Sequence, residues 1–128
     1  MTTVALVLAG IAAALHVYIW TMESITWKQP ATWKRFGVES QADADTQALF
    51  AYNQGYYNLF LAAVAIAGIV LVVADRDDAG WALVIAACGS MFAAALVLLS
   101  SGGQYARAAA TQGTIPALAV LFSVLALA

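Results

Sequence analysis

Two ionisable side chains interrupt the first apolar segment of this chain. His16 is the only histidine in the sequence, and Glu23 follows it along the same segment. On a helix their spacing is almost two turns, so both side chains lie on one face, about 10 Å apart along the axis. An imidazole and a carboxylate are groups that proteins use for acid/base catalysis and for holding a polar ligand. We therefore take Glu23 and His16 as candidate catalytic residues.

The composition indicates what kind of fold positions these two groups. The chain has 128 residues, of which 64% are hydrophobic and 9% are charged. A soluble domain usually carries about 25% charged residues, and so few polar side chains do not cover a globule of this size in water. The sequence therefore predicts an integral membrane protein of the all-α class, a transmembrane four-helix bundle that forms one domain over residues 1–128.

Four apolar segments carry this prediction. They cover about residues 3–25, 47–74, 81–100 and 112–128. Pro30 should end the first helix, because a proline inside a helix removes a backbone hydrogen bond. The stretch DRDDAG predicts a tight hairpin after the second helix, with Gly80 as a helix breaker. Pro116 fits the first turn of the fourth helix, where no intrahelical N–H is required.

Small residues recur every four positions in two of the segments. They are Ala5, Ala9 and Ala13 in the first, and Ala82, Ala86, Ser90 and Ala94 in the third. Rows of small side chains let helices approach closely in a lipid environment. Both rows are therefore expected at helix–helix contacts.

The charged loops predict an orientation in the membrane. The first and third loops hold four basic residues, Lys28, Lys34, Arg35 and Arg107. The second loop holds Arg76 among three aspartates. Because cytoplasmic loops carry an excess of Lys and Arg, we expect the first and third loops inside and both termini outside.

An antiparallel second helix would offer polar partners to the two ionisable groups. Ionisable side chains in a membrane helix normally face the bundle interior and have a partner there. If the two helices are aligned at one interface, His16 lies opposite Tyr57 and Asn58, and Glu23 lies opposite Asn53 and Gln54. The predicted ligand-binding set is Trp20, Asn53, Gln54, Tyr57, Asn58 and Gln112.

Two interpretations of this polar cluster are open at this stage. The side chains could hydrogen-bond only to hold the first two helices in register. Alternatively, they could line a pocket that binds a ligand or performs chemistry, which the crowding of polar groups at one end favours. One His and one Cys do not make a metal-binding set, so no metal and no cofactor are predicted. Haem with His16 as the sole axial ligand is the alternative.

Three stretches of the sequence resemble a known family. They are the residues His16, MES (22–24), Trp27, Pro30 and Phe36, then NQGYYNLFLA (53–62), then QGTIPALAVL (112–121). In this order they are similar to the bacterial domain-of-unknown-function family 1304. The resemblance implies four transmembrane helices in the bacterial inner membrane. It implies no established activity.

The leading prediction is an inner-membrane protein with a polar pocket between its first two helices. This pocket would bind a lipophilic small molecule or a lipid, with Glu23 as the acid/base if chemistry occurs there. One alternative is a small proton-coupled exporter of the multidrug type, which also uses a carboxylate in its first helix. Another is an accessory subunit of a larger membrane complex. Homo-oligomers are compatible with each prediction, and no nucleic-acid partner is expected, because the five basic residues are scattered over the loops.

Overall fold

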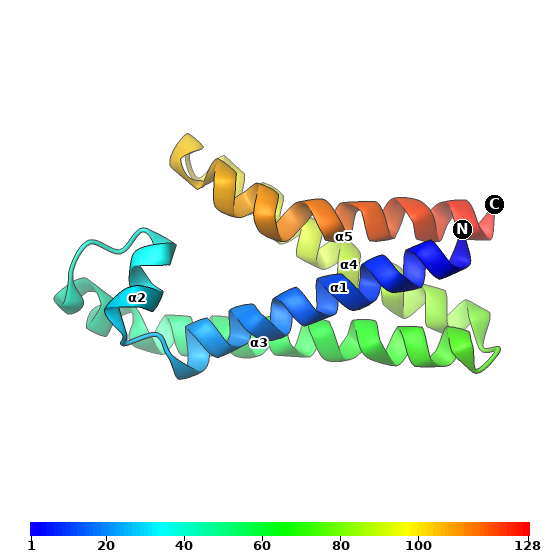
Figure 1. Ribbon diagram of the computed structural model, residues 1–128, viewed down its shortest axis with the longest axis horizontal. Helices are drawn as coiled ribbons and strands as arrows, with labels where there is room; N and C mark the ends of the chain where they lie inside the picture. Colours follow the sequence, from blue (N-terminus) through cyan, green and yellow to red (C-terminus); the bar gives the residue numbers. More distant parts are fainter. The chain divides into compact units, whose positions relative to one another are not determined.

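Helices form almost the whole chain. The computed structural model describes residues 1–128, is 88% helical and contains no strand. Its long helices are α1 (Thr2–Trp20), α3 (Gln41–Val73), α4 (Asp77–Ser100) and α5 (Ala106–Leu127) (Figure 1). Four helices are long and apolar enough to cross a membrane. The predicted all-α class, with the four long apolar helices of a transmembrane four-helix bundle, is confirmed.

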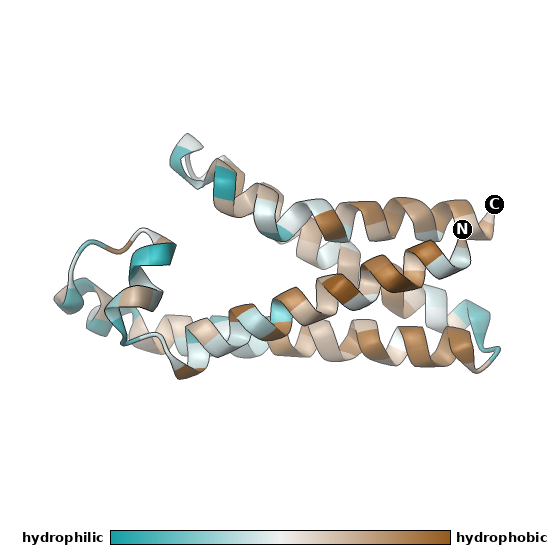
Figure 2. Ribbon diagram, viewed as in Figure 1, coloured by the Kyte–Doolittle hydropathy of each residue, from teal (hydrophilic) through white to brown (hydrophobic).

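The chain divides into two compact units. Unit 1 comprises Met1–Leu15 and Leu61–Ala128, and unit 2 comprises His16–Phe60. Unit 1 therefore contains α4, α5, the first part of α1 and the second part of α3. Unit 2 contains the polar connection between α1 and α3 together with the helix ends beside it. Figure 2 shows the hydrophilic colours gathered on this connection and on the turn between α3 and α4.

Small residues let α3 and α4 of unit 1 approach each other closely. A Cβ added at Gly68 would lie 2.8 Å from the backbone nitrogen of Val84, and one added at Gly80 would lie 2.6 Å from that of Val72. Gly80 is buried inside α4, which begins at Asp77. The prediction that Gly80 breaks the helix was therefore wrong: this glycine serves packing, because a side chain would separate the two backbones.

The helices α4 and α5 also pack against each other within unit 1. A Cβ at Gly113 would lie 2.6 Å from the Cβ of Ala95. Pro116 lies inside α5 and is buried, so its predicted place in the first turn was wrong. The helix begins earlier because the run from Ala106 to Ala110 is rich in alanine, the strongest helix former.

The two rows of small residues differ in burial. Ala5, Ala9 and Ala13 of α1 are buried, in agreement with a packing role. The α4 row is exposed, and the buried face of this helix carries other residues. The prediction for that row was wrong. With so much alanine in the helix, small side chains occur on every face and do not mark the packed one.

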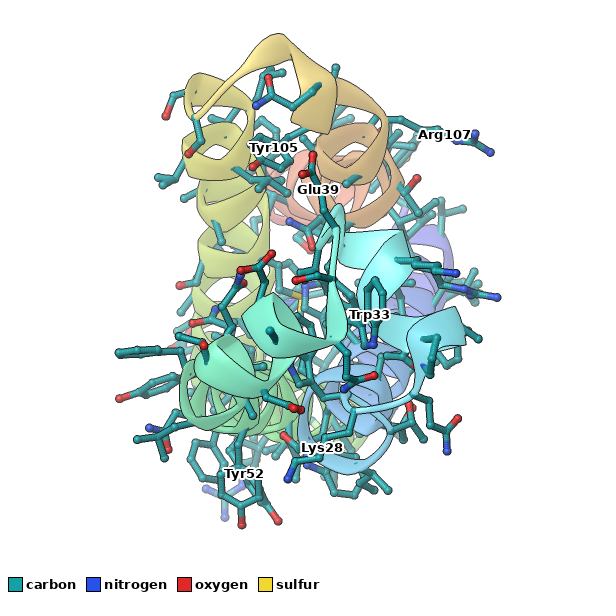
Figure 3. The ribbon with its side chains drawn as sticks, turned by 90° about the vertical axis from the view of Figure 1, so that its left-hand side faces the viewer. Lys28, Trp33, Glu39, Tyr52, Tyr105 and Arg107 are labelled. Atoms are coloured by element: carbon teal, nitrogen blue, oxygen red, sulfur yellow. The ribbon has the colours of Figure 1, made fainter.

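Unit 2 contains a small core of its own in the connection between α1 and α3. Residues 26–40, which we name the cap, include the short helices α2 (Pro30–Trp33) and η2 (Lys34–Phe36). The core of unit 2 joins the cap to the start of α3. Its four buried side chains are Trp27, Trp33, Ala44 and Ala51, with Phe36, Val38 and Ala48 packed against them. Pro30 begins α2 at a position where a helix needs no N–H donor. Figure 3 shows the labelled Trp33 within the cap, and Lys28 is exposed.

The helix α3 begins at Gln41, several residues before the predicted second span. The hydroxyl of Ser40 accepts a hydrogen bond from the backbone N–H of Asp43 at 3.1 Å. A serine at this position satisfies one of the free N–H groups of the first turn and so favours a helix start. The polar residues that follow are therefore helical as well.

Candidate functional site

The segment that carries Glu23 is a turn of π-helix. The α-helical part of α1 ends at Trp20, and Thr21–Ile25 forms the π-helix η1. The backbone N–H of Thr26 donates to the carbonyl of Thr21 at 2.9 Å, which is the wider hydrogen bond of this helix type. Single π-helical turns often occur at functional sites, because the extra residue turns side chains toward a new direction. Here the turn carries Glu23 and Ser24.

A glycine of α3 allows η1 to approach closely. A Cβ added at Gly55 would overlap the Ser24 hydroxyl and would lie 3.0 Å from the Cβ of Glu23. The Ser24 hydroxyl donates a hydrogen bond to the backbone carbonyl of Tyr52 at 2.9 Å. One helix therefore supplies both the space and the polar acceptor that hold η1 in place.

The Glu23 carboxylate is held by an amide of α3. The Asn58 Nδ2 donates to Glu23 Oε2 at 2.8 Å, and it also donates to the backbone carbonyl of Gln54 at 3.2 Å. The second bond fixes the amide on its own helix, so the first bond fixes the carboxylate. No ion pair with Lys or Arg balances the charge of Glu23.

Glu23 lines a groove in unit 2. This groove has a volume of about 440 Å³. Its lining residues are Glu23, Trp27, Phe36, Gln47, Phe50, Ala51 and Gln54. The walls are largely apolar and aromatic, with two side-chain amides and one carboxylate. Ligand sites in proteins commonly combine apolar walls with a few polar groups in this way.

The walls of the groove are held by the cap. The indole N–H of Trp27 donates to the backbone carbonyl of Ala44 at 2.8 Å. The rings of Trp27 and Phe36 meet edge to face, with centroids 5.2 Å apart. The hydrogen bond to Ala44 connects the cap to the start of α3, and the ring contact between Trp27 and Phe36 joins two walls of the groove.

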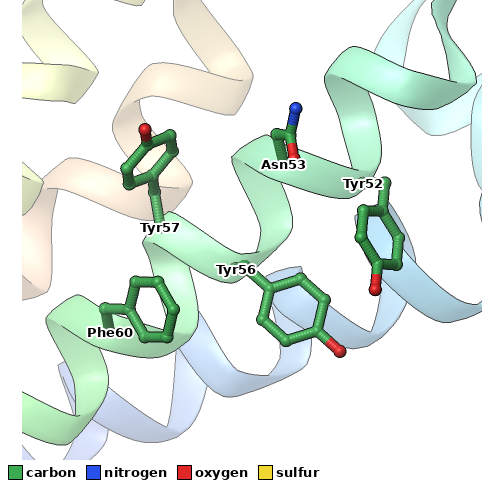
Figure 4. A pocket seen from close by; sticks show the side chains of 5 residues that line it. All are labelled: Tyr52, Asn53, Tyr56, Tyr57 and Phe60. Carbon is green, nitrogen blue, oxygen red and sulfur yellow. The ribbon is translucent and has the colours of Figure 1, made fainter.

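A smaller hollow of about 320 Å³ lies on α3. Its lining residues are Tyr52, Asn53, Tyr56, Tyr57 and Phe60, as Figure 4 shows. All five belong to one helix, and Tyr57 is 64% exposed. No ionisable carboxylate or amine lines this hollow. We therefore place the candidate site in the larger groove.

The structure distributes the predicted site residues over different places. Glu23 and Gln54 line the groove, Asn58 holds Glu23, and Asn53 and Tyr57 line the smaller hollow.

His16 and Trp20 are not among the lining residues of either hollow. His16 is 2% exposed on α1. Trp20 meets Tyr56 edge to face, with centroids 6.0 Å apart, and its indole nitrogen is buried with no hydrogen-bond partner. Gln112 belongs to α5 in unit 1.

The pairing between Glu23 and α3 differs from the predicted one by about one turn. Glu23 bonds to Asn58, the residue that the sequence reasoning paired with His16. The predicted pairing placed Glu23 and Phe50 at the same interface, whereas the hydrogen bond to Asn58 shifts Glu23 further along α3. The prediction also missed the groove walls Trp27, Phe36 and Phe50. A glycine in the NQG stretch was a signal of close approach.

Comparisons with known proteins agree with the family resemblance. The model of the family described as "Protein of unknown function (DUF1304)" matches residues 10–124. No curated protein and no solved structure matches the chain. Since the match covers nearly the whole sequence, the chain belongs to the DUF1304 family of proteins of unknown function.

Proposed function

We propose that this membrane protein binds a lipophilic small molecule or lipid in the groove beside Glu23. The observation that carries the proposal is the placement of one carboxylate, held by Asn58, in a groove whose walls include three aromatic rings. Its volume of about 440 Å³ is in the range of small-molecule sites.

The charge of Glu23 supports a functional role for the groove. Glu23 belongs to the apolar segment Thr2–Ile25, and ionisable residues in such segments often mark a substrate or ion pathway. A purely structural contact with Asn58 needs only a second amide in place of the acid. If the bound molecule undergoes proton transfer, Glu23 is the acid/base, because it is the only acidic or basic side chain among the groove residues.

The membrane and the orientation are part of the same proposal. We place the protein in the bacterial inner membrane with both termini outside. The excess of Lys and Arg in the first and third loops supports this orientation. The groove, which is formed beside the first loop, then lies at the cytoplasmic end of its helices.

Native mass spectrometry of the gently solubilised protein tests the proposal. The change Gln47→Trp adds a large ring at the exposed rim of the groove, and Thr46→Trp adds the same ring at an exposed neighbour outside it. Wild-type protein and Thr46→Trp should carry a bound lipophilic molecule. Gln47→Trp should lose it, because its ring fills the groove.

The variant Glu23→Gln gives the second arm of this test. It keeps the size of the side chain and removes its charge, and it should strongly lower ligand occupancy while circular dichroism and size-exclusion profiles stay unchanged. The exposed Glu39→Gln is the matched control, since this acid lies in the cap but outside the groove lining. Equal ligand occupancy in wild type, Gln47→Trp and Glu23→Gln would overturn the proposal.

Two other functions would give different results in the same preparation. A proton-coupled exporter should release protons when lipophilic cations are added to the purified protein. An accessory subunit should purify with a second, stoichiometric membrane protein and with no small molecule in the groove.

A further inference from the structure

We propose that the ligand of the groove is a lipophilic amine bound in its ammonium form. This inference rests on the proposed function and names its ligand class. The charge of the groove, the chemistry of its walls and the positions of the basic side chains of the cap support it.

The charge of the groove selects a cation. Seven residues line it, and Glu23 is the only ionisable one among them. The bond from Asn58 engages Oε2, and the partly buried Glu23 side chain lines the groove. An ammonium group supplies both the missing charge and an N–H donor for this carboxylate. A ligand carboxylate or phosphate would instead face a like charge.

The walls of the groove also suit a cation with an apolar body. Trp27, Phe36 and Phe50 contribute aromatic rings, and a cation over such a face is attracted by the electron-rich ring. Phe50 is 75% exposed and gives an alkyl chain a path from the groove toward the surrounding lipid. The amides of Gln47 and Gln54 are neutral and accept further hydrogen bonds from the head group.

The basic side chains of the cap do not line the groove. Arg35 donates a hydrogen bond to the hydroxyl of Tyr18 at 2.9 Å. The Lys34 ammonium lies 5.6 Å from the centre of the Trp33 ring. Lys28 is exposed on the cap. None of the three lines the groove, so the carboxylate is left for a cation from outside the protein.

Three probes of equal chain length test the ligand class. Dodecylamine, 1-dodecanol and dodecanoate carry a positive, a neutral and a negative head group. Each is titrated into the full-length protein in nanodiscs of a zwitterionic lipid, with tryptophan fluorescence as the signal and empty nanodiscs as the correction for partitioning. Dodecylamine should bind about tenfold or more tightly than dodecanol, the effect of one charge-assisted hydrogen bond. Dodecanoate should bind most weakly.

Two variants show whether Glu23 causes the preference. In Glu23→Gln the advantage of dodecylamine over dodecanol should disappear, whereas Glu39→Gln should keep it. Equal binding of the amine and the alcohol to wild type would overturn the ligand class and leave the proposed function standing. Binding of none of the probes in wild type, together with an empty groove in native mass spectrometry, would overturn both. Tightest binding of dodecanoate would also reject the amine.

Discussion

Two residues of α3 decide where the carboxylate of Glu23 lies. Asn58 fixes one of its oxygens, and Gly55 removes the side chain that would otherwise keep η1 away. The sequence pointed to both ionisable residues and to the amides, because their polarity is conspicuous in an apolar segment. It did not give the pairing, since an extra residue in a π-helical turn changes the direction of every side chain on it.

At this scale the change Gly55→Ala is expected to weaken both stability and binding. The new methyl group would overlap the Ser24 hydroxyl and crowd the Cβ of Glu23, so η1 must move away from α3. We expect a loss of about 1–3 kcal/mol in the free energy of unfolding, as for other overpacked sites. Thermal unfolding in detergent and dodecylamine titration measure the two effects.

The matched control is Gly89→Ala in α4. A Cβ at this helical position meets nothing within 4 Å. Replacing a helical glycine by alanine should therefore stabilise the protein by about 0.5–1 kcal/mol. If Gly55→Ala gave the same stabilisation, the close approach of η1 and α3 would not exist in the protein.

The cap supplies two walls of the groove, Trp27 and Phe36. Tryptophan is common as an interfacial anchor at the end of a membrane span, and Trp27 and Trp33 follow the first apolar segment. In the structure Trp27 and Trp33 are buried in the core of unit 2 instead. Composition alone does not separate these roles, because both place an indole beside a membrane helix end.

At this scale Trp27→Phe tests how the cap supports the groove. The change removes the hydrogen bond to the Ala44 carbonyl and part of a groove wall. Stability should fall by about 1–2 kcal/mol, and dodecylamine affinity should fall with it. Trp33→Phe is the matched change. Its indole bonds to Gln41 at 3.2 Å and lies outside the groove lining, so stability should decrease with affinity preserved. Equal losses of affinity in both variants would contradict this division.

Helix boundaries show which physical signals the sequence carries. Apolar length predicted four membrane helices, and the structure contains four. It did not locate the first residue of α3 or α5, because Ser40 and the alanine run after Tyr105 start helices in polar segments. Pro116 and Gly80 were interpreted as boundary residues. Both residues lie inside helices in the structure. Gly80 allows the close approach of α3, and a proline such as Pro116 is tolerated inside membrane helices.

At the scale of the whole molecule, the orientation is tested by enzyme fusions. Alkaline phosphatase joined after Ala128 should be active in bacterial cells, because we place the C-terminus outside. A fusion after Asp75 should also be active, whereas one after Gly103 should be inactive. Green fluorescent protein at the same three positions should give the opposite pattern. Active phosphatase after Gly103 alone would reverse the proposed orientation.

The length of α3 has a consequence for how a ligand arrives. The helix has 33 residues, and about 20 suffice to cross the hydrocarbon region. Counted from Val73, those residues end near Gln54, so with Val73 at one membrane surface the part of α3 that contributes to the groove would lie at the depth of the lipid head groups. An amphiphile that dissolves in the leaflet would then reach Glu23 by sideways diffusion. Its occupancy would follow its mole fraction in the lipid more closely than its concentration in water.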